Sequence, residues 1–318
     1  MNKVYAEKVI KIIENCQQIN KCELDIRCDE PMYLHTTFKV GGPADCYIRP
    51  KGDNFPSFCA SLLSRVKEEG IPFFILGGGA NIVVSDSGIR GIVLDTGAWK
   101  GSVLTEEGLV IKSGTTVDEA VERAAALELG GLESFAGMPG TVGGAVFMNA
   151  RCYDREISDI LSWIEFIDFN SSESCVKRIT ADKTDFSYKR SPFQGKDNLI
   201  IAACFKLTCG NKERIFDEIK KYKQDRRDKG HYLFPCAGSA FKNNRNFGKP
   251  TGQIIDELGL KGFSSGGAQI ALFHGNIVIN TGNASASDIR TLMDETAEKV
   301  KKETGFILEP EIMFIGDW

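Results

Sequence analysis

A serine and a glutamate in the C-terminal third of the chain have the residue types needed for acid chemistry. Ser239 stands between Gly238 and Ala240, so its hydroxyl could be exposed beside the polar residues that follow. No Gly-x-Ser-x-Gly sequence surrounds it, and the chain has only three histidines, which favours a proton-donating serine over a nucleophilic one. On its own, a serine in this setting is more often a helix cap or a turn hydroxyl.

Glu311 follows Pro310 in an otherwise apolar segment, which predicts a strand over residues 308–312. Burial in that strand would raise the pKa of Glu311 and let it act as an acid, while Glu309 would point to the opposite face. An exposed carboxylate at the rim of the sheet is an equally good interpretation of Glu311.

Two adjacent cations, Lys189 and Arg190, suit a carboxylate or an oxyanion. A second basic stretch, 220–229, is for the most part a solvated helix face, and a diphosphate contact near Lys229 is the alternative. His274 precedes an apolar strand and could hydrogen-bond a ligand, although a core histidine with one backbone partner is the commoner case.

Two glycine-rich stretches could hold a phosphate-bearing ligand with backbone groups. The longer, 130–144, contains six glycines and a proline, and the shorter, 77–81, reads Gly-Gly-Gly-Ala-Asn after a buried strand. Neither spells a P-loop or the Gly-x-Gly-x-x-Gly that opens a Rossmann helix. Tight turns are the alternative, and a dinucleotide site here would be of neither common kind.

Composition describes an ordinary globular protein. Its 318 residues, 42% of them hydrophobic, can bury a substantial core, and a net charge of −4 gives no reason to expect nucleic acid or a membrane surface. Ten cysteines without a Cys-x-x-Cys pair predict reduced structural thiols and no metal site. Because no signal peptide or bilayer-spanning segment is apparent, we expect a cytoplasmic protein.

The elements that must position these residues are a mixture of helices and strands. Helices are expected at 1–20, with Val4, Val9, Ile12 and Ile13 inward, and at 56–69, 116–129, 212–229, 251–258 and from 285 onward. Strands are expected at 36–40, 45–50, 72–76, 82–84, 91–95, 109–112, through most of 162–207, and at 276–280 and 308–312. Capping boxes open the helices at Thr116 and Ser285. The change near 208–212 from a segment of mostly β character to a charged helix predicts a domain boundary.

Six motifs in register make the chain resemble the UDP-N-acetylenolpyruvoylglucosamine reductase family, also called UDP-N-acetylmuramate dehydrogenase or MurB. The motifs lie at 35–44, 77–81, 136–144, 237–243, 259–262 and 308–311. Each one alone is weak, but together they cover nearly the whole chain in the family's order. The third segment lacks an obvious extra loop, which resembles the shorter class of the family.

The resemblance implies a mixed α+β and α/β protein with the FAD-binding fold of the vanillyl-alcohol oxidase type. Two FAD-binding subdomains, 1–95 with the N-terminal helix and 96–209, would precede a C-terminal α/β substrate-binding domain, 210–318. It also implies tightly bound FAD, NADPH as reductant, and reduction of UDP-N-acetylglucosamine enolpyruvate to UDP-N-acetylmuramate for peptidoglycan synthesis. We expect a monomer with no nucleic-acid or membrane partner.

By position, the resemblance makes Ser239 the proton donor to the α carbon of the substrate, while Glu311 and Lys189 stabilise the charge that develops on its carboxylate. It implies substrate contacts from Arg190, Lys229, Asn243 and His274. It implies FAD contacts from Gly77, Gly78, Gly79, Ala80, Asn81, Gly137, Pro139, Gly140, Thr141, Gly143, Gly144 and Asn149.

The chain departs from the family pattern in two places. Lys189 occupies the position of the family arginine and can supply the charge but not the planar fork. Alternation along a strand would point Arg190 to the opposite face, so we predict that Lys189 acts. Arg151, Asp154 and Arg155 replace glycines, which removes the reason to expect positive φ there, and Arg151 could add a charge near the flavin or its diphosphate.

Two other functions stay open. Another flavoprotein of the same fold, such as an alcohol oxidase, would share the glycine stretches but not the motifs at 237–243 and 308–311. A redox-inactive nucleotide-sugar binding protein is conceivable because of Lys189. Turnover of the enolpyruvyl substrate with NADPH would distinguish a reductase of this family from another flavoprotein. A protein that cannot be reconstituted with FAD would favour the redox-inactive binding protein.

Overall fold

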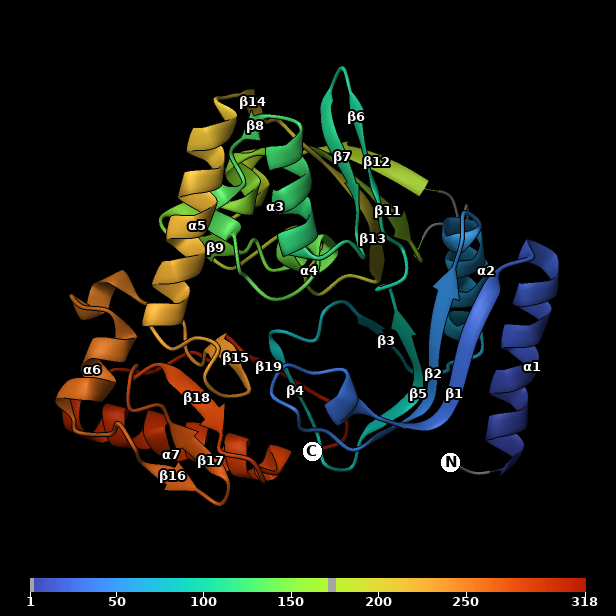
Figure 1. Cartoon of the computed structure of the whole chain (residues 1–318). Helices are drawn as coiled ribbons and strands as arrows, with labels where there is room; N and C mark the ends of the chain where they lie inside the picture. The colour runs from blue at the N-terminus through green and yellow to red at the C-terminus, as the bar shows by residue number, and fades with distance from the viewer. Residues whose placement is uncertain (1–2, 171–175) are drawn as a thin grey trace. The chain divides into compact units, whose positions relative to one another are not determined.

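The computed structural model of the chain describes residues 3–170 and 176–318. The predicted inward side chain of Val4 and the thiol of Cys175 lie outside the side chains that it describes. The chain divides into two compact units, the first made of 1–29, 45–78 and 90–224 and the second of 30–44, 79–89 and 225–318 (Figure 1). The boundary therefore runs through the shorter glycine stretch, between Gly78 and Gly79.

A four-stranded sheet, ordered β1-β2-β5-β3, forms one half of the first unit. Its strands are β1 (Glu23–Pro31), β2 (Pro43–Lys51), β5 (Ile89–Asp95) and β3 (Phe73–Leu76). The helices α1 (Lys3–Asn20) and α2 (Phe55–Glu68) lie side by side next to it (Figure 1). Val9, Ile13, Phe58 and Leu62 from the helices are buried in one cluster with Ile48 of β2, which holds this layer together.

The other half of the first unit is an antiparallel sheet ordered β12-β11-β13-β7-β6. Its strands are β12 (Val176–Thr180), β11 (Leu161–Asp168), β13 (Asn198–Phe205), β7 (Gly108–Lys112) and β6 (Ser102–Thr105). Three helices contribute to its buried cluster: α3 (Val117–Ala126), α4 (Val142–Phe147) and α5 (Lys212–Asp228). Two short antiparallel pairs complete it, β8 (Leu129–Gly130) with β14 (Thr208–Cys209) and the hairpin of β9 (Arg151–Cys152) with β10 (Arg155–Glu156).

The second unit packs two helices against an antiparallel sheet ordered β15-β18-β17-β16. The strands are β15 (Cys236–Ser239), β18 (Ile277–Asn280), β17 (Ala268–Ile270) and β16 (Ser264–Ser265), and the helices are α6 (Thr251–Glu257) and α7 (Ala286–Thr304). A parallel pair, β4 (Ile82–Val84) with β19 (Met313–Ile315), joins the segment after the glycine stretch to the C-terminus. Phe38, Phe241 and Leu292 are buried in the common core.

Most predicted elements are confirmed, with ends that differ by a few residues. Both capping boxes form: the Thr116 hydroxyl accepts from Glu119 N–H, and the Ser285 hydroxyl accepts from Asp288 N–H. The helix after Thr116 ends at Ala126, however, rather than running to residue 129, because β8 begins there.

Two predicted strands are wrong. Residues 36–40 form turns in which the Thr36 hydroxyl donates to the Val40 carbonyl at 2.8 Å and Lys39 has φ +58°. Residues 308–312 are not a strand either, since pairing with β4 starts only at Met313. In addition, β1 was not predicted, because its charged sequence Glu-Leu-Asp-Ile-Arg-Cys-Asp-Glu-Pro lies mostly on the exposed edge of its sheet.

Other predictions are tested in part. The nine described cysteines form no disulfide with one another, and reduced thiols stay a prediction. Across 3–170 and 176–318, no helix combines the length and the apolar character needed to cross a membrane. Within those same residues, no group of three or more His, Cys, Asp or Glu side chains could hold a metal ion. The three-domain division 1–95, 96–209 and 210–318 stays a prediction.

Candidate functional site

The segments that carry Ser239 and Glu311 are paired through their backbones in the second unit. Glu311 N–H donates to the Ala240 carbonyl at 2.9 Å, and Lys242 N–H donates to the Glu309 carbonyl at 2.9 Å. Between these bonds, Phe241 and Pro310 form a β-bridge. The two residues predicted to do acid chemistry are therefore held by one short ladder although they are far apart in sequence.

Ser239 is the last residue of β15 and follows Gly238, whose φ is +74°. Its side chain is half-buried, and its hydroxyl makes no hydrogen bond to the residues that the structure describes. A register shift in the pairing of β15 with β18 occurs just before it, at a bulge of the kind that aims a side chain away from the regular ladder. The hydroxyl is thus available to a ligand.

The side chain of Asn276 fastens the residues after Ser239. Its Oδ1 accepts from Phe241 N–H at 3.0 Å, its Nδ2 donates to the Phe241 carbonyl at 2.7 Å, and its own carbonyl accepts from Ala240 N–H at 2.8 Å. Asn276 is buried, so these bonds are shielded from water. Sequence analysis missed this residue, although an asparagine at the start of an apolar strand is a signal for a buried polar brace.

His274 is held in one tautomer by the same region. Its Nδ1 accepts from Asn276 N–H at 3.1 Å, so the neutral ring carries its proton on Nε2. Burial, and then the charge of Lys261, lower the pKa of His274 below its ordinary value. His274 can therefore donate one hydrogen bond to a ligand as a neutral group.

Two further predicted substrate residues also lie in the second unit. Lys229 is exposed after α5, with its Nζ 2.7 Å from Asp225 Oδ2. Asn243 is exposed too, and its Oδ1 accepts from Thr251 N–H at 2.9 Å at the start of α6. The two carboxylates of the 308–311 motif differ: Glu309 is exposed and pairs with Lys242 at 2.6 Å, whereas Glu311 is half-buried.

Asn81, at the end of the shorter glycine stretch, is tied to the Glu311 segment. Its Nδ2 donates to the Glu311 carbonyl at 3.0 Å, and its own carbonyl accepts from Met313 N–H at 3.0 Å. Gly79 lies against the first motif, because a Cβ built on it would be 2.0 Å from the His35 carbonyl oxygen. Four of the six sequence motifs, 35–44, 77–81, 237–243 and 308–311, are thus linked in the second unit around Glu311 and Ser239.

In the first unit, the two glycine stretches touch each other. A Cβ on Gly78 would lie 2.5 Å from Gly140 Cα, and one on Gly143 would lie 2.8 Å from Ser113 Cβ. Side chains at these positions would force the backbones apart. Thr141 caps α4 by accepting from Gly144 N–H at 3.4 Å.

Two hydroxyls, Ser134 within the longer stretch and Ser113 beside it, fit a cofactor cradle. Ser113 Oγ and Ser134 Oγ are buried and make no hydrogen bond to described residues. The backbone carbonyl of Ser113 accepts a hydrogen bond from Gly143 N–H at 2.8 Å, so Ser113 contacts the loop directly. Because an unpaired buried hydroxyl is costly, a polar ligand at the loop would stabilise this arrangement, and the residues present fit FAD. Sequence analysis missed both serines.

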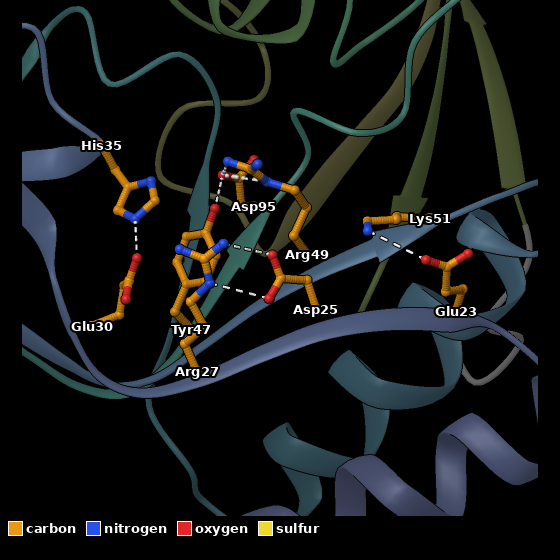
Figure 2. A network of polar contacts seen from close by, with 9 residues as sticks. All are labelled: Glu23, Asp25, Arg27, Glu30, His35, Tyr47, Arg49, Lys51 and Asp95. Atoms are coloured by element: carbon orange, nitrogen blue, oxygen red, sulfur yellow. Dashed lines mark hydrogen bonds and ion pairs between the residues drawn. The ribbon is translucent and has the colours of Figure 1, made fainter.

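A buried polar network supports the strand that leads into this cradle (Figure 2). Tyr47 hydroxyl donates to Asp95 Oδ2, which also accepts from Arg49 Nη2 at 2.7 Å. Burial, and then the nearby Asp95 carboxylate, raise the pKa of Tyr47, so it stays a donor. In the β3–β5 pair, Asp95 lies opposite Leu76, which is the last residue of β3 and immediately precedes Gly77.

The cations Lys189 and Arg190 lie in a tight turn, not in a strand. Ser187 N–H donates to the Arg190 carbonyl at 3.1 Å and Arg190 N–H donates back at 2.9 Å, while Lys189 has φ +59°. Strand alternation therefore does not decide which of Lys189 and Arg190 faces a ligand, and that prediction is wrong in its reason. Lys189 is half-buried and Arg190 is exposed.

The hairpin that carries the replaced glycine positions has positive φ at its corner. Tyr153 and Asp154, at the corner of the β9–β10 hairpin, have φ +47° and +66°. Among the three replaced positions, positive φ is therefore found at Asp154, where the expectation fails, and not at Arg151 or Arg155. Arg151 donates to Asp154 at 2.8 Å and its Cζ lies 5.9 Å from the centre of the Tyr188 ring, so its charge is held locally.

The side chain of Asn149, predicted to contact the cofactor, is instead bonded within the protein. Its side chain is fully buried, and its two amide hydrogens go to Glu156 Oε2 and the Ser187 carbonyl, both at 2.9 Å. The side chain has no N–H left for a ligand. The predicted FAD residues otherwise divide between the units: Gly77, Gly78, Gly137, Pro139, Gly140, Thr141, Gly143 and Gly144 are in the first, and Gly79, Ala80 and Asn81 are in the second.

Comparisons with known proteins match both parts of the chain. A family model described as UDP-N-acetylenolpyruvoylglucosamine reductase, C-terminal domain, matches residues 229–315, and one described as FAD binding domain matches 58–173. The UDP-N-acetylenolpyruvoylglucosamine reductase of Treponema denticola is 41% identical, over 91% of this chain and 93% of its own. That of Caldanaerobacter subterraneus is 35% identical, over 96% and 98%.

A solved structure is similar over nearly the same length. The MurB reductase of Thermus caldophilus matches with a TM-score of 0.74 and 29% identity, covering 92% of this chain and 99% of that one. Together with the FAD-binding model, this likeness confirms the predicted FAD-binding fold followed by a C-terminal domain.

Proposed function

The chain belongs to the UDP-N-acetylenolpyruvoylglucosamine reductase family, and from this premise we propose that it reduces UDP-N-acetylglucosamine enolpyruvate to UDP-N-acetylmuramate with FAD and NADPH. The observation that carries the proposal is the ladder between the Ser239 and Glu311 segments, with Asn81 bonded to the Glu311 carbonyl. We further propose a cytoplasmic monomer that makes this precursor of peptidoglycan.

FAD, when bound, supplies the hydride transfer that couples oxidation of NADPH to reduction of the substrate. The chain would hold it on backbone groups of the glycine stretches, where Gly78 and Gly140 meet, with the Ser113 hydroxyl as a further contact. The support for this assignment is the close approach of the two loops and the unpaired buried hydroxyl.

Ser239 supplies the proton in this proposal. Reduction of the enolpyruvyl double bond adds one hydride and one proton, and the proton is delivered to the α carbon. The Ser239 hydroxyl is half-buried, unbonded to described residues and fixed by the ladder and by Asn276. A positioned acid of this kind is typically worth about 10²- to 10⁴-fold in rate.

Glu311 and a cation of the 187–190 turn stabilise negative charge on the substrate carboxylate. Glu311 is the better of the two neighbouring carboxylates for this role, because it is half-buried whereas Glu309 is exposed. Lys189 is favoured over Arg190 because it is less exposed. His274 then donates a neutral hydrogen bond, and Lys229 and Asn243 contact the nucleotide-sugar part.

A visible absorption spectrum of the purified protein tests the proposal. We expect a flavin spectrum that is bleached by NADPH and restored under anaerobic conditions by the enolpyruvyl substrate. A colourless protein that binds the nucleotide sugar but cannot be reconstituted with FAD would point to a binding protein. A flavin that the enolpyruvyl substrate does not reoxidise, while an alcohol reduces it, would point to an oxidase.

A further inference from the structure

The carboxyl end of α4 is fastened to the turn that carries the two cations. Asn149, two residues beyond α4, has φ +41° and a fully buried side chain. Its Nδ2 donates to the Ser187 carbonyl and to Glu156 Oε2, both at 2.9 Å, and its Oδ1 accepts from Ser158 N–H at 3.1 Å. One side chain thus joins three separate stretches of the first unit.

Gln194 makes a second attachment on the other side of the turn. Its Nε2 donates to the Phe147 carbonyl at 3.0 Å and to the Lys189 carbonyl at 3.1 Å. The Ser191 hydroxyl also donates to the Phe147 carbonyl, at 2.7 Å. The last residue of α4 therefore accepts two side-chain bonds from the segment that follows the turn, and Gln194 bonds the backbone of Lys189 itself.

The opposite end of α4 begins in the longer glycine stretch. Thr141 caps the helix, and Gly143 N–H donates to the Ser113 carbonyl at 2.8 Å. Ala145 and Val146 are buried in the core of the unit, so the short helix cannot shift freely. It forms a rigid spacer between the glycine loop and the cation-bearing turn.

We propose that Asn149 and Gln194 are positioning residues that fix Lys189 and Arg190 relative to the glycine loop through α4. The inference rests on the proposed function, in which a cation of this turn stabilises the substrate carboxylate. Lys189 is in the left-handed region, which costs energy and persists only where the surroundings hold it. A charge held in place before the substrate arrives needs no reorganisation during the reaction.

The conservative variants Gln194→Glu and Asn149→Asp test this assignment. Each keeps the size of the side chain but removes the N–H groups and sets a carboxylate against carbonyl oxygens. Gln18→Glu is the matched control, because Gln18 is exposed on α1. Two kinds of measurement are needed: hydrogen exchange of peptides covering 185–195, and the two half-reactions measured separately with the FAD-loaded protein.

We expect faster hydrogen exchange in 185–195 for both variants, unchanged FAD content, and reduction by NADPH within about twofold of wild type. Reoxidation by the enolpyruvyl substrate should slow by about 10- to 100-fold, the cost typical of a misplaced catalytic group. If Asn149→Asp does not fold, Gln194→Glu decides alone.

Unchanged exchange in 185–195, or equal slowing of both half-reactions, would overturn the inference. Failure of the proposed function looks different, since wild-type protein itself would then not be reoxidised by the substrate. The exchange measurement would still report whether the two amides hold the turn.

Discussion

The side-chain amide of Asn276 pairs with both backbone polar groups of Phe241, at 3.0 Å and 2.7 Å. It substitutes for a neighbouring strand at the point where the chain leaves β15 after Ser239. Because both groups of Phe241 are buried, removing the amide leaves a donor and an acceptor unsatisfied.

Asn276→Ala should therefore lower the free energy of unfolding by about 3 kcal/mol, one unsatisfied buried group costing about 1–3 kcal/mol. The measurement is equilibrium denaturation in urea, with the exposed Asn283→Ala as control. A loss below about 0.5 kcal/mol, the size of an ordinary surface substitution, would show that the brace is dispensable.

Gly78→Ala should weaken retention of FAD. The new Cβ would meet the backbone of Gly140 at 2.5 Å, so the two glycine stretches must separate. Gly210→Ala is the control, because its Cβ meets only the flexible end of Ile215, at 3.1 Å. Flavin fluorescence titration of the apoprotein measures the effect, and equal affinity in Gly78→Ala and wild type would contradict the cradle.

Stability should depend on the protonation of His231. Burial, and then the charges of Arg226, His274 and Lys229, lower its pKa to about 4, against an ordinary value of 6.5. Between these values the unfolded chain binds more protons, so stability from His231 is present above pH 6.5 and is lost as the pH falls toward 4. His231→Gln should flatten the profile of unfolding free energy in this window, and an unchanged slope would refute the assignment.

Lys189→Ala should slow reoxidation by the enolpyruvyl substrate more than Arg190→Ala does. Loss of a charge-stabilising group costs about 10²- to 10³-fold in rate when the site excludes water. Steady-state kinetics of both variants, with NADPH reduction as the internal reference, give the comparison. A larger loss for Arg190→Ala would transfer the role to the exposed guanidinium.

The sequence predicted the features that depend on local chemistry. Capping boxes, apolar helix faces and glycine motifs are local signals, and Thr116, Ser285 and the 77–81 stretch behave accordingly. The failures have a tertiary cause. Residues 36–40 have β-branched and aromatic side chains typical of a strand, but Phe38 is buried by a turn in the core of the second unit.

The candidate site shows the same division. Ser239 and Glu311 are recognisable by residue type, whereas Asn276 and Gln194 act through partners far away in sequence. Ser113 stands out only because the fold buries its hydroxyl without a hydrogen bond to the described residues. The turn at Tyr188 and Lys189 was also hidden, since lysine is not a usual turn former at the positive φ that Lys189 has. Only the folded backbone reveals which amides hold it.

The most direct test of the account separates the two half-reactions of Ser239→Ala under anaerobic conditions in a stopped-flow instrument. The account predicts that NADPH bleaches the flavin at the wild-type rate, while reoxidation by UDP-N-acetylglucosamine enolpyruvate is slowed by about 10²- to 10⁴-fold. Reoxidation at the wild-type rate, or equal slowing of both steps, would contradict Ser239 as the proton donor.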